Sequence, residues 1–292
     1  MSVRAFPIAT MVAFAFLSQP ALAVAVDTSL RPMPKPAAPS PGEAAVTETH
    51  VANAAFGRWI EGFKGRARAA GISSAVLTRA FDGVRYDADV IARDRNQSEF
   101  TKTIWEYLDS AASDTRVENG KAALAANRDL LSRIEGRYGV PAEVVVAVWG
   151  LESAYGTFRG TNDVIQSMAT LAFDGRRGAF FEEQLVAALQ ILQSGDVSPR
   201  KMTGSWAGAM GHTQFIPTSY LAYAVDFTGD GRRDIWSDDP TDALGSTAAY
   251  LDRHGWVTGQ PWGVEVMLPE GFDYRQTGKR VQKDPSEWAA LG

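Results

Sequence analysis

A carboxylic acid, Glu152, lies near the end of an otherwise apolar run, VPAEVVVAVWGLES, at 140–153. The run is apolar nearly all round, which indicates a helix buried in the core, and Pro141 suits its first turn. On that helix Glu152 follows Val148 by four residues and Val145 by seven, so its carboxylate points along an apolar face. Desolvation there raises the pKa of the acid, which then holds a proton at neutral pH for donation to a leaving group. Cleavage of a glycosidic bond requires such a donor, whereas a solvent-facing helix-terminal Glu is the ordinary structural alternative.

A second carboxylate would make this acid one half of a hydrolytic pair. Asp163 and Asp174 are the candidates that follow it in the chain. Asp174 precedes Gly175-Arg176-Arg177, so we expect it to pair with an arginine at a loop rather than to take part in catalysis.

The run DFTGDGRRD at 226–234 follows the ligand spacing of an EF-hand calcium loop. Oxygen-bearing side chains occupy positions one, three and five, and glycine occupies position six, where the loop turns sharply. Position twelve is Ser237 rather than Glu, and the following DPTD is typical of a helix start, with Asp239 as N-cap and Asp242 in the first turn. The candidate ligands within the loop are Asp226, Thr228, Asp230 and Arg232.

Composition excludes several classes of function. The 292 residues are 45% hydrophobic and 22% charged, as in an ordinary globular protein, and the formal net charge is -5. This charge offers no basic surface for phosphates, so no nucleic-acid partner is expected. The absence of cysteine excludes disulfides, a cysteine nucleophile and a lipid-bearing cysteine. With only three histidines, His50, His212 and His254, no histidine metal site is expected.

Three segments divide the chain. Residues 1–23 are typical of a secretory signal peptide, with Arg4 before an apolar run and a small-residue cleavage site at Ala21-Leu22-Ala23. Residues 24–50, rich in proline and alanine, are expected to form an extended linker. Residues 51–292 form the predicted folded domain. No later run is long and apolar enough to span a bilayer, so we expect an exported, periplasmic protein without a membrane anchor.

Apolar residues recur at helical spacing through this domain, which is therefore predicted to be mainly α. A little β structure is expected near 262–268. The segment GSWAGAMGHTQFIPTSY at 204–220, rich in glycine and aromatic residues, is expected to be a loop that lets the backbone approach a ligand closely. The helical stripes are Phe100, Ile104 and Leu108, then Leu124, Leu131, Ile134 and Tyr138, then Phe181, Leu185, Ala188 and Leu192 before a helix end at Gly195.

Three motifs carry a resemblance to a known family: AVWGLESAYGTFRG, LAFDGRRGAFFEEQL and GSWAGAMGHTQFIPTSYLAYAVDFTGDGRRDIW. From about Phe56 to Leu268 the sequence resembles the membrane-bound lytic transglycosylase B family of peptidoglycan-cleaving enzymes. The resemblance implies a lysozyme-like helical fold with an EF-hand-like loop. It also implies cleavage of the β-1,4 bond between N-acetylmuramic acid and N-acetylglucosamine, leaving a 1,6-anhydromuramyl end. Glu152 would then be the single general acid and base, and the chemistry would need no cofactor.

The resemblance also implies roles in the substrate cleft. Ser205 is expected to hydrogen-bond Glu152, the Gln214 amide to meet an N-acetyl group, and Phe215 and Tyr250 to lie at the cleft wall. For the two aromatic residues a core position is the structural alternative. His212 receives no catalytic role.

Two further expectations follow from the resemblance. The family's modified calcium loop takes its acidic ligand later, here at Asp242, so a structural calcium ion is expected. The chain ends at Gly292, whereas the family continues into a segment with a Tyr-Asn motif that helps to close the cleft, so an incomplete cleft is expected.

The expected partners are peptidoglycan glycan strands and proteins of cell-wall synthesis. Two alternatives stay open: a lysozyme-like hydrolase, whose products end in a reducing sugar, and a non-catalytic envelope module that binds glycan. Intact Glu152, Ser205 and Gln214 favour an enzyme over the binding module.

Overall fold

The computed structural model describes residues 41–96, 103–261, 263–278 and 280–292, and these residues are mainly helical, which confirms the predicted fold class. Contacts divide the chain into two compact units, one spanning Pro39–Thr258 and the other including Gly259–Gly292. In the described part of the second unit, η3 (Tyr274–Thr277) is a short 3-10 helix and α12 (Pro285–Ala289) begins with a capping box.

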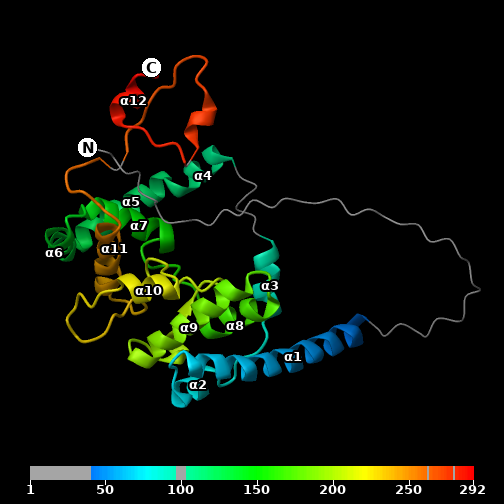
Figure 1. Cartoon of the computed structure of the whole chain (residues 1–292). Helices are drawn as coiled ribbons and strands as arrows, with labels where there is room; N and C mark the ends of the chain where they lie inside the picture. Colours follow the sequence, from blue (N-terminus) through cyan, green and yellow to red (C-terminus); the bar gives the residue numbers. More distant parts are fainter. Residues whose placement is uncertain (1–40, 97–102, 262, 279) are drawn as a thin grey trace, which may run out of the picture. The chain divides into compact units, whose positions relative to one another are not determined.

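The helices of the first unit (Figure 1) are α1 (Pro41–Ala69), α2 (Ser74–Ala80), α3 (Ala88–Arg95), α4 (Ile104–Ala111), α5 (Asp114–Ala126), α6 (Arg128–Tyr138), α7 (Ala142–Ser153), α8 (Val164–Asp174), α9 (Gly178–Ser194), η2 (Pro199–Lys201), α10 (Pro217–Tyr223) and α11 (Thr241–Arg253).

The first unit has two hydrophobic clusters. The larger one surrounds the packed pair α8 and α9, which contact α1, α2, α3 and α10. The predicted stripe of α9, from Phe181 to Leu192, is buried there, and the helix ends at left-handed Gly195 as predicted. The smaller cluster joins α6, α7 and α11 through buried side chains such as Ile134, Val145 and Leu244. Because α11 contributes to both clusters, it connects the two halves of the unit.

The β structure is not where the sequence placed it. Two short strands, β1 (Asn162–Asp163) and β2 (Thr203–Gly204), pair antiparallel with Asn162 opposite Gly204. Residues 263–268 contain no strand, and Trp262 lies outside the described residues. Strands of two residues are too short to produce the alternating pattern by which a strand is predicted.

Helix α4 forms at the predicted place but is not buried. Ile104 and Leu108 are 59% and 43% exposed, and Phe100 lies outside the described residues. Their spacing therefore predicted the helix correctly, and the described residues bury no side chain of α4.

The N-terminal boundaries stay predictions in part. The predicted signal peptide lies outside the described residues, as does the predicted linker up to Ser40. Helix α1 starts at Pro41, earlier than position 51, because proline suits a first helical turn and the residues that follow it favour a helix. In the described part of the chain, every helix is too short or too polar to cross a membrane.

Candidate functional site

Glu152 lies in the last turn of α7. Pro141 precedes the helix as its N-cap residue, and the helix stops after Ser153. One face of α7 is buried against the smaller cluster, whereas Leu151 on the other side is 51% exposed. The helix is thus buried on one face only, not all round as its composition suggested, because it lies at the edge of that cluster. Its buried residues are Val145, Val146, Trp149, Gly150 and Ser153.

The chain turns sharply after α7. Ala154, Tyr155 and Gly156 have φ angles of 47°, 59° and 84°, which are left-handed. Non-glycine residues adopt this conformation only where their surroundings hold them. The Tyr155 hydroxyl donates to the Arg116 carbonyl at 2.7 Å, and its ring lies so close to Gly150 that a Cβ there would come within 2.6 Å of it. Packing therefore fixes the end of the helix that carries the acid.

The Glu152 carboxylate is open to solvent, yet within the described ranges it makes no hydrogen bond or ion pair. Its pKa is raised above the ordinary value because surrounding protein displaces part of its hydration and no donor replaces the lost water. The carboxylate is more exposed than an apolar face would make it, but the direction and cause of the pKa shift agree with the prediction. Such an acid can hold a proton and deliver it to a ligand that enters from solvent.

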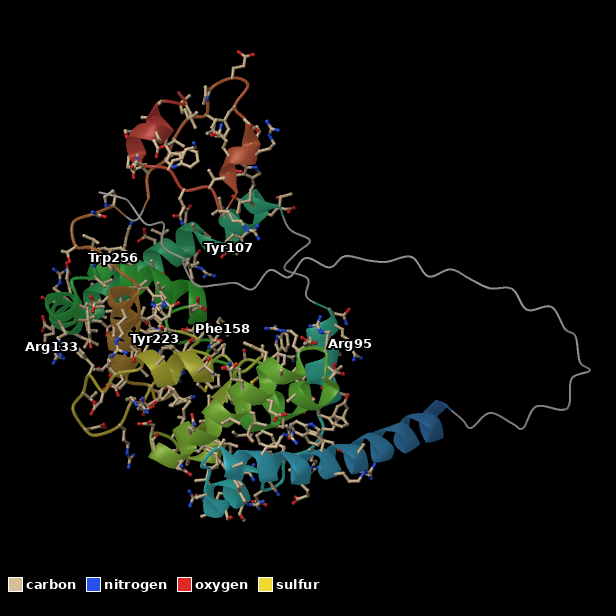
Figure 2. The ribbon with its side chains drawn as sticks, viewed as in Figure 1. Arg95, Tyr107, Arg133, Phe158, Tyr223 and Trp256 are labelled. Atoms are coloured by element: carbon tan, nitrogen blue, oxygen red, sulfur yellow. The ribbon has the colours of Figure 1, made fainter. Side chains whose placement is uncertain are left out.

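A pocket of about 490 Å³ lies beside the chain that follows α7. The loop and β2 come together because Gly160 and Gly204 lack side chains, and a Cβ on Gly160 would lie 2.1 Å from the Gly204 carbonyl carbon. Phe158, labelled in Figure 2, is 73% exposed at this wall. The pocket is lined by Thr157, Phe158, Arg159, Gly160, Thr161, Thr203, Ser205, Gln214 and Trp236.

Gln214 reaches this pocket from the glycine-rich segment. Its backbone is left-handed, with φ 52°. Its amide nitrogen donates to the carbonyls of Arg159 at 3.2 Å and Gly211 at 2.9 Å. Both bonds use the NH₂ group, so the amide oxygen is left to accept a hydrogen bond from a ligand.

Ser205 lines the same pocket, but its expected bond to Glu152 is not formed. Its hydroxyl accepts from the Ala209 amide at 3.1 Å, which holds the glycine-rich turn, and among the described residues it does not bond Glu152. Glu152 is not among the lining residues; it precedes Thr157, the first of them, by five positions. The structure thus brings Ser205 and Gln214 into one pocket and places the acid on the helix that leads to it.

Phe215 and Tyr250 pack against each other, away from the lining of this pocket. Their rings meet edge to face, with centroids 6.0 Å apart. Phe215 is buried in the larger cluster, and half-buried Tyr250 packs against that cluster from α11. Burial also raises the pKa of the Tyr250 hydroxyl. These contacts favour the core position that was the structural alternative.

The two other candidate carboxylates have structural partners. Asp174 pairs with Arg95 of α3 at 2.6 Å, rather than with an arginine of its own loop (Arg95 is labelled in Figure 2). Asp163 caps α8 by accepting from the Gln166 amide at 2.9 Å. Of these three carboxylates, only Glu152 has no bonded partner among the described residues.

The acidic loop brings together Asp226, Asp230 and Asp242, each of which offers a carboxylate oxygen within 4.8 Å of the others. Buried Asp242 accepts from the amides of Phe227 and Thr228 at 2.8 and 2.9 Å and so holds the loop to the first turn of α11. Burial raises the pKa of Asp242.

The remaining two predicted ligands bond within this loop. The Thr228 hydroxyl donates to Asp226 at 3.0 Å, and the Arg232 amide donates to Asp230 at 2.9 Å. Three convergent carboxylates form an oxygen donor set of the kind that hard divalent cations prefer. The three carboxylates are therefore a candidate site for a divalent cation such as calcium.

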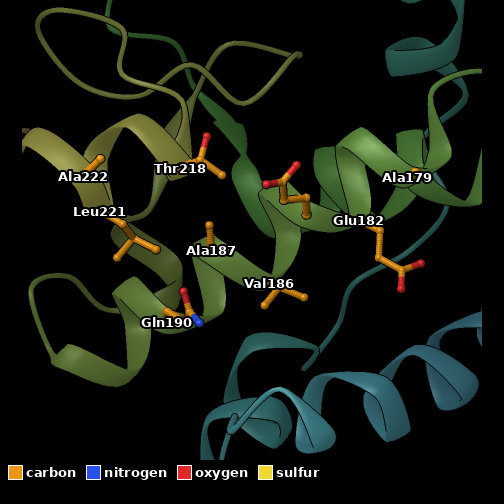
Figure 3. Close-up of a pocket in the computed structure, with 9 residues that line it drawn as sticks. Ala179, Glu182, Val186, Ala187, Gln190, Thr218, Leu221 and Ala222 are labelled. Atoms are coloured by element: carbon orange, nitrogen blue, oxygen red, sulfur yellow. The ribbon is translucent and has the colours of Figure 1, made fainter. Parts of the chain in front are cut away.

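A larger hollow, of about 990 Å³, lies between α9 and α10 and contains no predicted site residue (Figure 3). Its floor is apolar, with Val186, Ala187 and Leu221. Glu182 at its edge pairs with Arg66 at 2.7 Å. The volume of a pocket alone therefore does not identify the candidate site. The smaller pocket is the better candidate because Ser205 and Gln214 line it.

The sequence analysis did not single out Arg159 and Trp236, and it gave His212 no catalytic role. Arg159 and Trp236 line the pocket, and His212 lies behind it. All three occur within the quoted motifs, but nothing in their spacing indicates that Arg159 and His212, 53 positions apart, meet in space.

The fold is helical and lysozyme-like, with an acid of raised pKa at the end of α7 and a pocket that contains Ser205 and Gln214 beside the chain that follows this helix. Residues 55–292 match the family described as Transglycosylase SLT domain, and the chain belongs to that family. The predicted family resemblance is thereby confirmed.

Known relatives agree with this assignment. The membrane-bound lytic murein transglycosylase B of Escherichia coli K12 is 40% identical over 172 residues, which are 57% of this chain and 47% of that protein. SltB3 of Pseudomonas aeruginosa, solved with NAG-NAM-pentapeptide and with NAG-anhNAM-pentapeptide, is 51% identical with a TM-score of 0.77, over 81% of this chain and 63% of that one. Slt35 of Escherichia coli, solved with calcium, is 33% identical with a TM-score of 0.61, over 72% and 65%. The chain thus spans about half the length of its curated relative.

Proposed function

We propose that this protein is a peptidoglycan lytic transglycosylase, which cleaves the bond between N-acetylmuramic acid and N-acetylglucosamine and leaves a 1,6-anhydromuramyl end. The observation that carries the proposal is Glu152, an acid with a raised pKa and no bonded partner among the described residues, on the helix that leads to the pocket of Gln214. Support comes from SltB3, 51% identical, which has been solved with both a NAG-NAM and a NAG-anhNAM pentapeptide.

Glu152 performs both proton transfers. As an acid it protonates the glycosidic oxygen while positive charge develops at C1 of the muramyl sugar. The resulting carboxylate then takes the proton of the C6 hydroxyl as that oxygen bonds to C1, which returns Glu152 to its acid form. The hydroxyl is held in the same molecule, so its effective concentration exceeds that of water. The ion pair of Asp174 with Arg95 fits this mechanism, because no second carboxylate is required.

The pocket orients the sugar. The free amide oxygen of Gln214 accepts from the N–H of an N-acetyl group, and exposed Phe158 offers an apolar surface to a ring. Ser205 acts indirectly, since its hydroxyl holds the turn that presents Gln214. Phe215 directly follows Gln214, and its packing against Tyr250 anchors that end of the segment in the larger cluster.

Calcium binds the loop of Asp226, Asp230 and Asp242 and stabilises the fold without entering the chemistry. The carboxylates would supply the charge for the ion, and the Thr228 hydroxyl and the Arg232 carbonyl would be its further oxygen ligands. The calcium complex of the relative Slt35 supports this role.

The protein acts in the periplasm, to which residues 1–23 direct it as a signal peptide, with residues 24–40 as linker and the helical domain beyond. Its partners are glycan strands and, at the wall, proteins of cell-wall synthesis. Neither a bound cofactor nor a membrane anchor is needed for these steps.

Digestion of purified peptidoglycan in heavy-oxygen water, followed by mass spectrometry, tests the proposal. If the C6 hydroxyl is the nucleophile, the new muramyl ends are unlabelled and lighter than hydrolytic ends by the mass of one water. A hydrolytic muramidase run in parallel provides labelled, reducing ends for comparison, and Glu152→Gln provides the inactive control. Labelled reducing ends from this protein would identify a lysozyme-like hydrolase, and binding of glycan without any cleavage would identify a binding module.

A further inference from the structure

His212 is buried where three segments of the first unit meet, and it is only 3% exposed. Its ring contacts Trp149 of α7, Arg159 of the pocket wall and Ser237 of the loop before α11. The mechanism proposed above does not use this histidine. Its contacts nevertheless reach both the helix of the acid and the pocket.

The partners of the ring determine its protonation. Trp149 Nε1 lies 3.1 Å from His212 Nδ1, and because an indole nitrogen only donates, Nδ1 must be an unprotonated acceptor. The proton of the neutral ring is therefore on Nε2, which donates to the Ser237 carbonyl at 2.8 Å. Arg159 Nη1 lies 3.1 Å from Nε2, but both are donors in this tautomer, so that contact is not a hydrogen bond. Nη1 donates instead to the Ser237 carbonyl at 2.5 Å, and the two lone pairs of that oxygen accept from both Nη1 and Nε2.

His212 contacts α7 on both sides of Glu152. Trp149 precedes Glu152 by three residues, and Ser153 follows it. The Ser153 hydroxyl donates to the His212 backbone carbonyl at 2.5 Å and accepts from the Gly156 amide at 2.9 Å. Ser153 therefore links the turn after α7 directly to the backbone of His212.

His212 contacts the pocket wall through Ser237 and Arg159. Arg159 Nη2 bonds Asp238 at 2.6 Å, and the Arg159 carbonyl accepts from Gln214, the pocket amide. A shift of the ring therefore moves the Ser237 carbonyl, the Arg159 side chain and the edge of the pocket together.

We propose that neutral His212, protonated on Nε2, is a positioning residue that holds the Glu152 end of α7 and the Arg159 wall of the pocket in their working arrangement. The proposal rests on the proposed function. Protonation of Nδ1 would place two donors against each other at Trp149 and add a positive charge beside Arg159. Arg159, Asp234 and Asp238 are the charged groups that face the ring. Burial and Arg159 oppose a positive charge on the ring, whereas the Ser237 carbonyl and the two carboxylates favour it. The arrangement is therefore lost as the pH falls through the pKa of His212, which burial lowers below its ordinary value.

The first test is the pH profile of turnover on peptidoglycan. The wild type should lose kcat/KM on the acid side, where Glu152 itself stays protonated and competent. His212→Gln keeps a donor toward Ser237 but does not titrate, so its acid limb should disappear. His212→Phe keeps a ring and loses both bonds, so kcat should fall about tenfold to a hundredfold with a smaller change in KM. His254→Gln is the matched control and should keep the wild-type acid limb. An unchanged acid limb in a folded His212→Gln would overturn the proposal.

The second test does not depend on turnover. Long-range proton–nitrogen NMR of the full chain at pH 7 should show His212 as the Nε2-protonated tautomer, and a protonated Nδ1 would overturn the proposal. If the wild type cleaves no glycan at any pH, the proposed function fails by itself. The affinity for NAG-anhNAM-pentapeptide then decides the role of His212, because it should fall at acid pH in the wild type and not in His212→Gln. Equal pH dependence of binding in both proteins would exclude a positioning role.

Discussion

Two exposed carboxylates of this protein, Glu152 and Asp226, differ in the direction of their pKa shifts. The Asp226 oxygens accept from the amides of Gly231, Gly229 and Asp230 at 2.8, 2.6 and 3.2 Å, and the Gly231 bond contributes most to lowering its pKa. Glu152 has no such donor within the described residues, and desolvation raises its pKa.

Exposure alone therefore does not predict what a carboxylate can do. Backbone donors stabilise the charged form, which suits Asp226 to hold a loop and a cation. Absence of donors leaves desolvation as the dominant effect, which suits Glu152 to hold and transfer a proton. The difference is one of local backbone direction: the Asp226 loop points its amides at the carboxylate, whereas Glu152 lies at the C-terminal end of α7, where helical amides point away.

The largest expected effect is that of Glu152→Gln on turnover. The amide can neither donate nor accept the transferred proton, so turnover should fall by about a thousandfold or more, with glycan binding retained. Product formation from peptidoglycan measures the first quantity, and binding of NAG-anhNAM-pentapeptide the second. The two side chains are nearly the same size, so the melting temperature should not fall. A folded variant within about tenfold of the wild-type rate would remove Glu152 from the mechanism.

The next effect is that of calcium on stability. Calcium at about a hundred times its dissociation constant should add roughly 2.7 kcal/mol to the free energy of unfolding, since only the folded loop assembles the three carboxylates. Asp226→Ala and Asp230→Ala should each abolish the gain. Glu183→Ala, which removes an exposed carboxylate of α9, is the matched control and should keep it. Melting curves that are the same in calcium and in chelator would refute the site.

The pH dependence of activity and stability should distinguish Glu152 from Asp226, because the pKa of Glu152 is raised and that of Asp226 is lowered. Glu152 must be protonated to act, so turnover should fall about tenfold per pH unit above its raised pKa. Its contribution to stability also falls as pH rises from the ordinary value of 4.5 through that raised pKa, because the folded state binds the proton more tightly there.

The contribution of Asp226 to stability should change with pH in the opposite direction. With its pKa lowered from 3.8, its contribution is present at higher pH and is lost as pH falls through the folded-state value. Thermal melts from pH 3 to 8 of the wild type, Glu152→Gln and Asp226→Asn measure both signs. Parallel curves for all three proteins would show that neither carboxylate is perturbed.

Local sequence patterns predicted much of this fold, because their causes are local. The position of α7, the buried stripe of α9 and its end at Gly195 follow from spacing and from the conformational freedom of glycine. The exposure of α4 did not, because an apolar stripe predicts a helix face but not whether other residues cover it.

The site was predictable in part. Glu152 was predicted from its apolar neighbours and from the family resemblance, and Gln214 from the family resemblance alone. The bond of Ser205 to Ala209 and the pairing of Phe215 with Tyr250 depend on turns and packing that no short motif specifies. The same limit applies to Asp174, which was expected to find an arginine nearby in sequence and found Arg95 in another helix.

That ion pair gives the smallest expected effect and the sharpest test of whether one carboxylate suffices. Asp174 is 11% exposed and its partner Arg95 is 59% exposed, so Arg95 can return to water when the charge of Asp174 is removed. Asp174→Asn should therefore cost about 1 kcal/mol of stability and change turnover by no more than about twofold. Arg95→Gln breaks the same pair from the other side and is the matched control, with the same two outcomes expected. If Asp174→Asn abolished turnover in a folded protein while Arg95→Gln did not, the carboxylate itself would be needed, and a two-carboxylate hydrolase would replace the single acid and base.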